Sequence, residues 1–89
     1  MSTAATISLR VRVLLFASYA DLAGSGELEV TTAAPATVAD VVRRVRDLAP
    51  GGDRMPPRPL VARNQVHAHL DDPVHDGDEV AILPPMAGG

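Results

Sequence analysis

Hydrophobic and polar residues alternate near the start of the chain, over residues 7–16. A period of two is typical of a β-strand with one buried face. Residues 13–16 are apolar on both faces, which predicts a strand that enters the centre of a sheet. The segment Glu27–Val30 also alternates and carries charges outward, so it predicts an edge strand paired antiparallel with the first. Residues 79–83 predict the last strand.

Between these strands, apolar residues recur at helical spacing and predict one amphipathic helix. The apolar stripe consists of Val38, Val41, Val42, Val45, Leu48 and Ala49. We expect Thr37 to cap the N-terminus, with Asp40 three residues later completing a capping box. Pro50 and the two glycines after it end the helix. Valine has a low helix propensity, so we expect packing against the sheet to hold this helix.

The remaining segments predict short elements. Residues 17–23 have helical spacing, residues 60–62 and 66–70 read as strands, and residues 51–59 form a loop rich in proline and glycine. Turns are expected at 64–65, 71–73 and 76–78. A crossover helix between the first and last strands favours placing them side by side and parallel. The sequence therefore predicts an α+β roll, a mixed sheet curled around one main helix.

Composition limits the classes of function. The 89 residues suffice for one small domain, and the net charge of −3 argues against nucleic acid as a partner. The chain has no cysteine and every basic side chain is arginine, so thiolate metal sites, cysteine nucleophiles and a lysine Schiff base are excluded. No apolar run reaches membrane-spanning length, and we expect a cytoplasmic protein without a membrane partner.

Histidines suggest one candidate metal site. His67 and His69 lie two residues apart on one face of an expected strand, with Asp71 and Asp72 nearby. No third ligand has a convincing spacing, so the sequence predicts no metal site. No set of serine or threonine, histidine and acid resembles a nucleophilic triad. We therefore expect no autonomous active site.

The last six residues, Pro84–Gly89, follow a core strand directly. Proline lacks a backbone donor, so Pro84 and Pro85 end the sheet pairing and keep the start of this tail extended. Glycine leaves the terminal carboxyl group of Gly89 unhindered and able to enter a narrow slot. The alternative is a frayed terminus without a role.

Four stretches together resemble a known family. They are Leu14–Ala17 with Asp21–Gly24, Ala62–Gln65, Asp76–Ala81 and Leu83–Gly89. The sequence resembles the ubiquitin-like β-grasp sulfur carriers, and among them the small subunits of molybdopterin synthase. The acidic glycine turn, the strand, the double proline and the final Gly-Gly, in that order, carry most of the resemblance.

The resemblance implies a β-grasp domain over residues 1–83 and a tail over 84–89. Gly89 would carry sulfur as a thiocarboxylate. A ubiquitin-activating-type adenylyltransferase would adenylate its carboxylate with ATP, and a sulfur donor protein would then supply the sulfur. The tail would enter the large, catalytic subunit of the synthase and deliver sulfur to a pterin precursor. No bound cofactor is implied.

The resemblance also implies a partner-docking surface. Its expected members are Phe16, His67, Leu83, Pro84, Pro85, Met86, Ala87 and Gly88. Phe16 and Leu83 are equally expected in the core, because apolar strand residues are usually buried.

Three other functions stay open. The chain would also fit a sulfur carrier for thiamin, cysteine or tRNA thiolation. A ubiquitin-like modifier joined to target lysines through Gly89 is a second alternative, and a plain interaction domain with an inert tail is the third.

Overall fold

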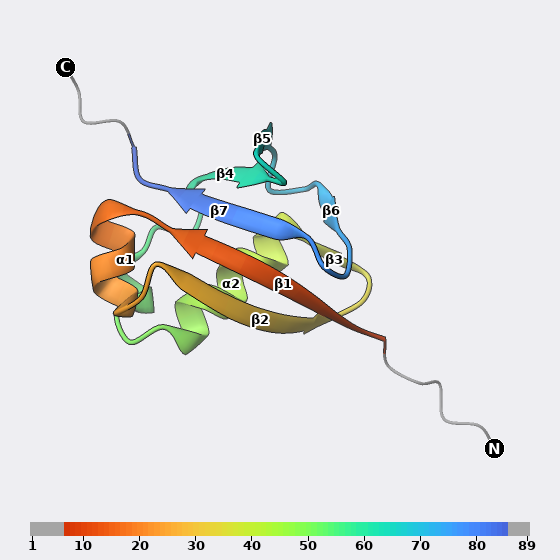
Figure 1. The fold of residues 1–89 in the computed structure, drawn as a ribbon, viewed down its shortest axis with the longest axis horizontal. Helices are drawn as coiled ribbons and strands as arrows, with labels where there is room; N and C mark the ends of the chain where they lie inside the picture. The colour runs from red at the N-terminus through yellow and green to blue at the C-terminus, as the bar shows by residue number, and fades with distance from the viewer. Residues whose placement is uncertain (1–6, 86–89) are drawn as a thin grey trace.

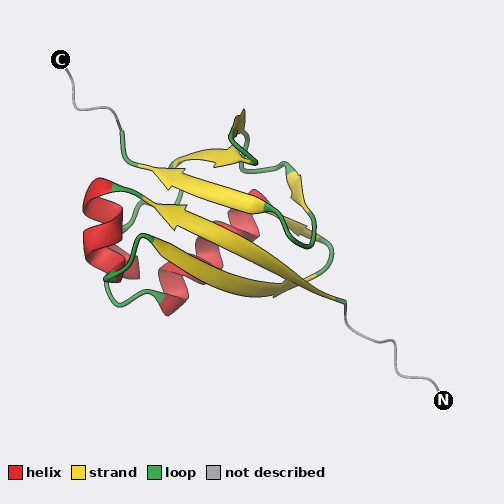
Figure 2. Cartoon of the chain, in the orientation of Figure 1, coloured by secondary structure: helices red, strands yellow, loops and turns green. Residues whose placement is uncertain are grey.

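A computed structural model describes residues 7–85 and shows one five-stranded sheet with the strand order β2-β1-β7-β4-β5. The helix α2 (Val38–Leu48) crosses one face of this sheet, and the short helix α1 (Ala17–Ala23) lies at the end where β1 stops (Figures 1 and 2). The strands are β1 (Ser8–Leu15), β2 (Glu27–Ala33), β4 (Leu60–Arg63), β5 (Val66–Ala68) and β7 (Glu79–Leu83).

The central pair of the sheet is parallel. β1 pairs with β7 from Arg12 opposite Glu79 to Leu15 opposite Ile82. β2 pairs antiparallel with β1 on one side, and β4 pairs antiparallel with β7 on the other. This arrangement confirms the predicted mixed sheet with its first and last strands side by side. The crossover through α2 is what permits the parallel pairing, because parallel neighbours need a long connection.

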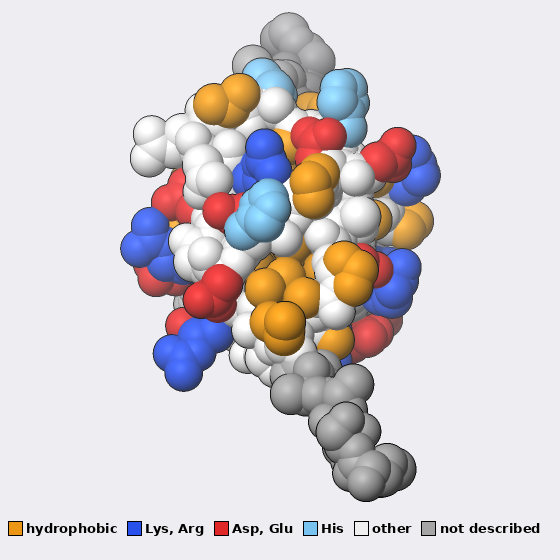
Figure 3. Space-filling model, turned by 90° about the vertical axis from the view of Figure 1, so that its right-hand side faces the viewer, with side chains coloured by type: hydrophobic (Ala, Val, Ile, Leu, Met, Phe, Trp, Pro, Cys, Tyr) orange, Lys and Arg blue, Asp and Glu red, His pale blue; other side chains and the backbone are white. Residues whose placement is uncertain are grey.

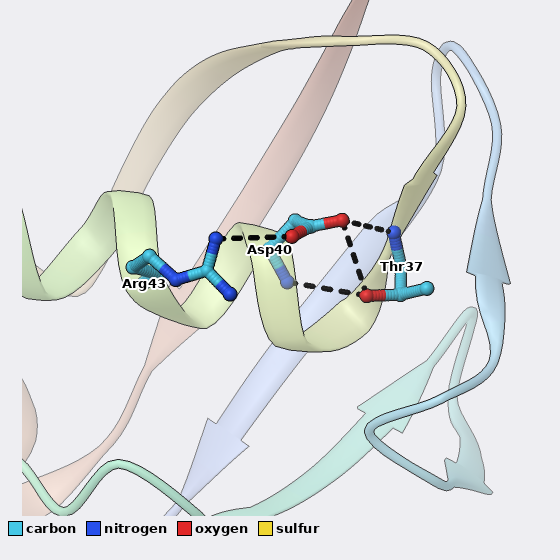
Figure 4. Close-up of polar contacts among 3 residues, drawn as sticks. All are labelled: Thr37, Asp40 and Arg43. Atoms are coloured by element: carbon cyan, nitrogen blue, oxygen red, sulfur yellow. Dashed lines mark hydrogen bonds and ion pairs between the residues drawn. The ribbon is translucent and has the colours of Figure 1, made fainter.

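The helix α2 begins with the predicted capping box (Figure 4). The Thr37 hydroxyl accepts from the backbone N–H of Asp40 at 3.3 Å, and the Asp40 carboxylate accepts from the backbone N–H of Thr37 at 2.9 Å. Arg43 donates to the other oxygen of Asp40 at 3.2 Å. Two backbone donors at the helix start are thereby satisfied, which compensates for the weak helix propensity of its valines.

The prediction of the apolar stripe is wrong for one residue, Leu48. Leu48 is 53% exposed, whereas Ala49 is buried. At 100° per residue, Ala49 lies near the centre of the stripe and Leu48 at its margin, so only Ala49 faces the sheet.

Three small elements are absent from the sequence-based expectation. β3 (Ala36–Thr37) and β6 (Pro73–Val74) form a separate two-stranded sheet, and a 3₁₀ turn covers Gly52–Arg54 in the expected loop. The sequence indicates only a turn at 71–73. Strands of two residues are too short to show a period, so no pattern predicts them.

The core lies between the inner face of the sheet and α2. The side chains that are almost completely buried are aliphatic: Ile82, Val11, Val13, Val30, Val38, Val41, Val42, Val45 and Val80. Tyr19 of α1 and Met55 of the loop close its edges. Within residues 7–85, no helix is long and apolar enough to cross a membrane.

Candidate functional site

The strands β1 and β7 end together, at the left of Figure 1, where β7 runs into Pro84. Their last parallel pair is Leu15 with Ile82, and both of these side chains are buried. Phe16 and Leu83 each follow this pair by one residue. Because successive strand residues face opposite sides of a sheet, Leu83 lies on the outer face, away from α2. The sequence leaves open whether Phe16 and Leu83 belong to the core, and in the structure neither is part of the buried cluster.

Cross-strand pairing extends this surface from β1 and β7 over two more strands, β4 and β5. On the outer face Ala81 lies between Leu14 of β1 and Ala62 of β4, and Ala62 in turn lies opposite His67 of β5. Leu60, the first residue of β4, lies opposite Leu83. We call this surface the apolar patch: Leu14, Phe16, Leu60, Ala62, Ala81 and Leu83.

The apolar patch exposes large side chains next to the start of the tail. Leu60 is 52% exposed and Phe16 is 45% exposed, while Leu83 and Pro84 are partly buried. His67 is exposed at the end of the row that runs through Ala62. Large apolar side chains gathered on an otherwise polar surface are typical of a protein-binding site. The expected tail residues Met86, Ala87, Gly88 and Gly89 lie outside the described residues.

Leu60 is a site residue that the sequence does not predict. It precedes the buried Val61 and reads as one more strand residue, so its exposure carries no signal of its own in the sequence. Only the register between β4 and β7 shows that it neighbours Leu83.

The outer face changes character away from the tail. Arg12 donates to the Glu79 carboxylate at 2.8 Å, and Arg12 also lies opposite Glu29 of β2. The hydrogen bond to Glu79, together with the negative charge of Glu27, raises the pKa of Arg12. Arg10 belongs to the same charged region. The sheet therefore presents an apolar half beside the tail and a charged half beyond it.

The turn before β7 holds β4 and β7 in the register that forms the apolar patch. The Asp78 carboxylate accepts from the backbone N–H of His75 at 2.8 Å and from the side-chain amide of Asn64 at 3.2 Å. The Asn64 side chain also accepts from the backbone N–H of Glu79 at 3.0 Å. These bonds tie the β4–β5 turn to the start of β7, which keeps β4 in place beside it.

Asp78 has a perturbed acidity for the same reason. Partial burial pulls the pKa of Asp78 upward, but the N–H groups of His75 and Asn64 pull it down further. The pKa of Asp78 therefore lies below its ordinary value, and the carboxylate is the form that the turn binds.

The histidines do not form a metal centre among the described residues. Figure 3, which views the molecule from the right-hand side of Figure 1, shows the histidine side chains on that side as separate patches. No group of three or more histidine, cysteine or acidic side chains comes together within residues 7–85 to hold a metal ion. His75 lies 3.8 Å from Asp78, as part of the turn described above.

Residues 13–89 match the family model described as the ThiS family. Two curated proteins named molybdopterin synthase sulfur carrier subunit are similar over nearly their whole length. The protein from Chlamydomonas reinhardtii is 31% identical over 91% of this chain and 100% of its own. The one from Escherichia coli is 36% identical over 89% of this chain and 99% of its own.

Solved structures share the fold. Small archaeal modifier protein 1 of H. volcanii has a TM-score of 0.80 and 28% identity, covering 88% of this chain and 99% of that one. A complex of subunits 1 and 2 of the molybdopterin-converting factor from Helicobacter pylori contains a chain with a TM-score of 0.63 and 21% identity, covering 91% of this chain and 100% of that one. The predicted β-grasp fold is confirmed.

Proposed function

This chain belongs to the ThiS family, and we propose that it is the sulfur-carrier subunit of a molybdopterin synthase. The observation that carries this proposal is the similarity to two sulfur-carrier subunits over nearly their entire length, at 31% and 36% identity. The apolar patch supports it, because such a carrier needs a surface that holds its partner while the tail is engaged. In this proposal the domain binds the partner, and the chemistry takes place at the tail.

The chemistry is assigned to the carboxyl group of Gly89. A carboxylate is a poor acyl donor, so an adenylyltransferase first joins Gly89 to AMP from ATP and releases pyrophosphate. A sulfur donor protein then supplies sulfur at the hydrosulfide level to the acyl carbon, AMP leaves, and a thiocarboxylate remains. This soft nucleophile transfers its sulfur to a pterin precursor. We propose the cytoplasm as the location of this chemistry.

The partner at the apolar patch is, in this proposal, the large subunit of the synthase. In the H. pylori structure, subunits 1 and 2 of the molybdopterin-converting factor form a protein–protein complex. Phe16, Leu60 and Leu83 would bury their side chains against that partner, with His67 at the edge. Pro84 and Pro85 would direct Met86, Ala87, Gly88 and Gly89 into its active site, where exclusion of water protects the activated terminus.

An intact-mass measurement tests the carrier chemistry. The protein is incubated with the adenylyltransferase of its host, ATP and a sulfur donor, and a variant without Gly89 serves as control. The proposal expects a mass gain that corresponds to one oxygen replaced by sulfur, and none in the control. Addition of the pterin precursor and the large subunit should then yield the dithiolene product. If a demonstrably active adenylyltransferase produces no thiocarboxylate, the carrier function is wrong.

A ubiquitin-like modifier is the second candidate, favoured by the TM-score of 0.80 to a small archaeal modifier protein. The two functions differ in the molecule to which Gly89 transfers its group: a sulfur carrier gives sulfur to a pterin precursor, and a modifier joins its own carboxyl group to a lysine of another protein. A modifier would appear on gels as lysine-linked conjugates that depend on Gly89 and resist thiols. A carrier for another thiolation pathway would form the same thiocarboxylate but would not support dithiolene formation with the large subunit.

A further inference from the structure

Charge is unevenly distributed along this chain. Residues 40–58 contain five of the eight arginines and three aspartates, so this segment has a net charge of +2. The rest of the chain has three arginines against eight acidic residues, a net charge of −5. The positive segment comprises most of α2 and the loop after it. A basic surface on an acidic protein therefore covers the side of the sheet that faces away from the apolar patch.

A groove lies within this basic surface, between α2 and the loop that precedes β4. It has a volume of about 240 Å³, with Arg43, Arg46 and Arg58 around it and the apolar side chains of Ala39, Val42 and Leu70 beneath. We call it the arginine groove. The Nε–H group of Arg46 donates to the backbone carbonyl of Met55 at 2.9 Å, which fixes one wall.

The other two arginines are accessible. The side chain of Arg43 is 68% exposed even though it contacts Asp40, and Arg58 is exposed in the loop. Arg58 stands between Pro57 and Pro59, whose fixed φ angles restrict the backbone that presents it. Guanidinium groups form bidentate hydrogen bonds with carboxylates, and this geometry makes arginine suited to recognising acidic side chains.

We propose that the arginine groove is a docking site for an acidic peptide segment of a partner protein. Carboxylates of that segment pair with Arg43 and Arg58, and one of its aliphatic side chains lies on Val42 and Leu70. The apolar base of the groove fits such a mixed segment better than a free phosphate ion. The usual phosphate position at a helix start is also occupied here, because the Asp40 carboxylate accepts from the backbone N–H of Thr37, the N-cap of α2.

The proposal goes beyond the sulfur-carrier function. The apolar patch lies on the outer face of the sheet, and α2 covers the inner face (Figure 2). Arg43 and Arg46 lie on α2 at that inner side, whereas Arg58 also lines a hollow that includes His67 and Leu60 of the apolar patch. A partner in the arginine groove would therefore be held mainly at α2 and would reach the margin of the apolar patch at Arg58.

A titration of the full chain with two peptides tests this inference. One peptide alternates glutamate and leucine, and its control has glutamine in place of glutamate. Binding is followed by backbone amide NMR. We expect shifts around Val42, Arg43, Arg58 and Leu70 with the acidic peptide only. The double substitution Arg43→Gln with Arg58→Gln should weaken binding at least tenfold, whereas Arg44→Gln, outside the groove, should change it less than twofold.

Other results would overturn the proposal. One is the absence of NMR shifts at millimolar concentrations of the acidic peptide. The others are equally tight binding of the glutamine peptide, and a loss of affinity in Arg44→Gln as large as that in the double variant. Full competition by millimolar inorganic phosphate would instead assign the groove to a small anion. Thermal melts of the variants separate a binding defect from unfolding, because both substituted side chains are exposed. None of these measurements depends on Gly89, so the sulfur-carrier function stands or fails separately.

Discussion

Leu60 lies directly opposite Leu83 in the antiparallel ladder between β4 and β7, at the point where the sheet ends and Pro84 begins. Two leucines from segments more than twenty residues apart thus form the part of the outer face nearest to the tail. Leu60 is 52% exposed. The proposed docking of a partner beside the tail would use this position.

The first prediction concerns this leucine. Leu60→Asp should weaken binding of the large subunit at least tenfold, since a charge would be buried at the centre of an apolar interface. Isothermal titration calorimetry of the complex measures this loss. Val66→Asp is the matched control, because Val66 is also an exposed strand residue but its register with Arg63 places it outside the apolar patch. If both variants lose the same affinity for the large subunit, Leu60 is not part of a specific docking surface.

Substitutions at the neighbouring residues Ile82 and Leu83 should have different effects, one on stability and the other on docking. Ile82 points into the core and is 1% exposed, so Ile82→Ala should lower the free energy of unfolding by about 2–5 kcal/mol. Leu83→Ala should cost much less stability and weaken the complex with the large subunit. Urea denaturation and calorimetry on both variants check this. If Leu83→Ala lowers the free energy of unfolding as much as Ile82→Ala does, Leu83 serves core packing rather than docking.

The capping box of α2 should contribute measurably to folding. Thr37→Ala removes the acceptor for the backbone N–H of Asp40 and should lower the free energy of unfolding by about 1 kcal/mol. Thr37→Ser keeps the hydroxyl and should restore most of the loss. If the alanine and serine variants unfold at the same denaturant concentration, the hydroxyl is not what stabilises the helix start.

Stability should depend on pH through Asp78. The pKa of Asp78 is lowered in the folded state, so its contribution to stability is complete above the unfolded value of about 3.8. That contribution is lost as the pH falls from there through the lower folded pKa. Asp78→Asn should therefore be less stable than the parent by about 1–2 kcal/mol at pH 7. The difference should narrow below about pH 4.

Urea denaturation between pH 7 and pH 2.5 measures this difference. Asp71→Asn is the control, because the Asp71 side chain is exposed. A stability gap between Asp78→Asn and the parent that stays constant over the whole range would show that the bonds of Asp78 do not require its charge.

Much of the fold follows from local patterns in the sequence. A period of two predicts β1 and β2, the apolar segment 79–83 predicts β7, and a period of 3.6 predicts α2 with its cap at Thr37. The central parallel pair follows from topology, because a crossover helix between two apolar strands leaves few alternatives. The chemical assignment of Gly89 comes from the motif at the end of the chain and rests on resemblance, since that segment lies outside the described residues.

The sequence by itself thus determined the main helix, the longer strands, their order and the family, because periodicity, capping and turn residues are local properties. Only the tertiary structure decided which surfaces those elements share. Strand register brought Leu60 beside Leu83, and His67 into one row with Ala62. The fold of the loop onto α2 brought Arg58 to Arg43. Such neighbours are set by contacts between distant segments, and a change of one residue in register would turn each strand side chain to the opposite face.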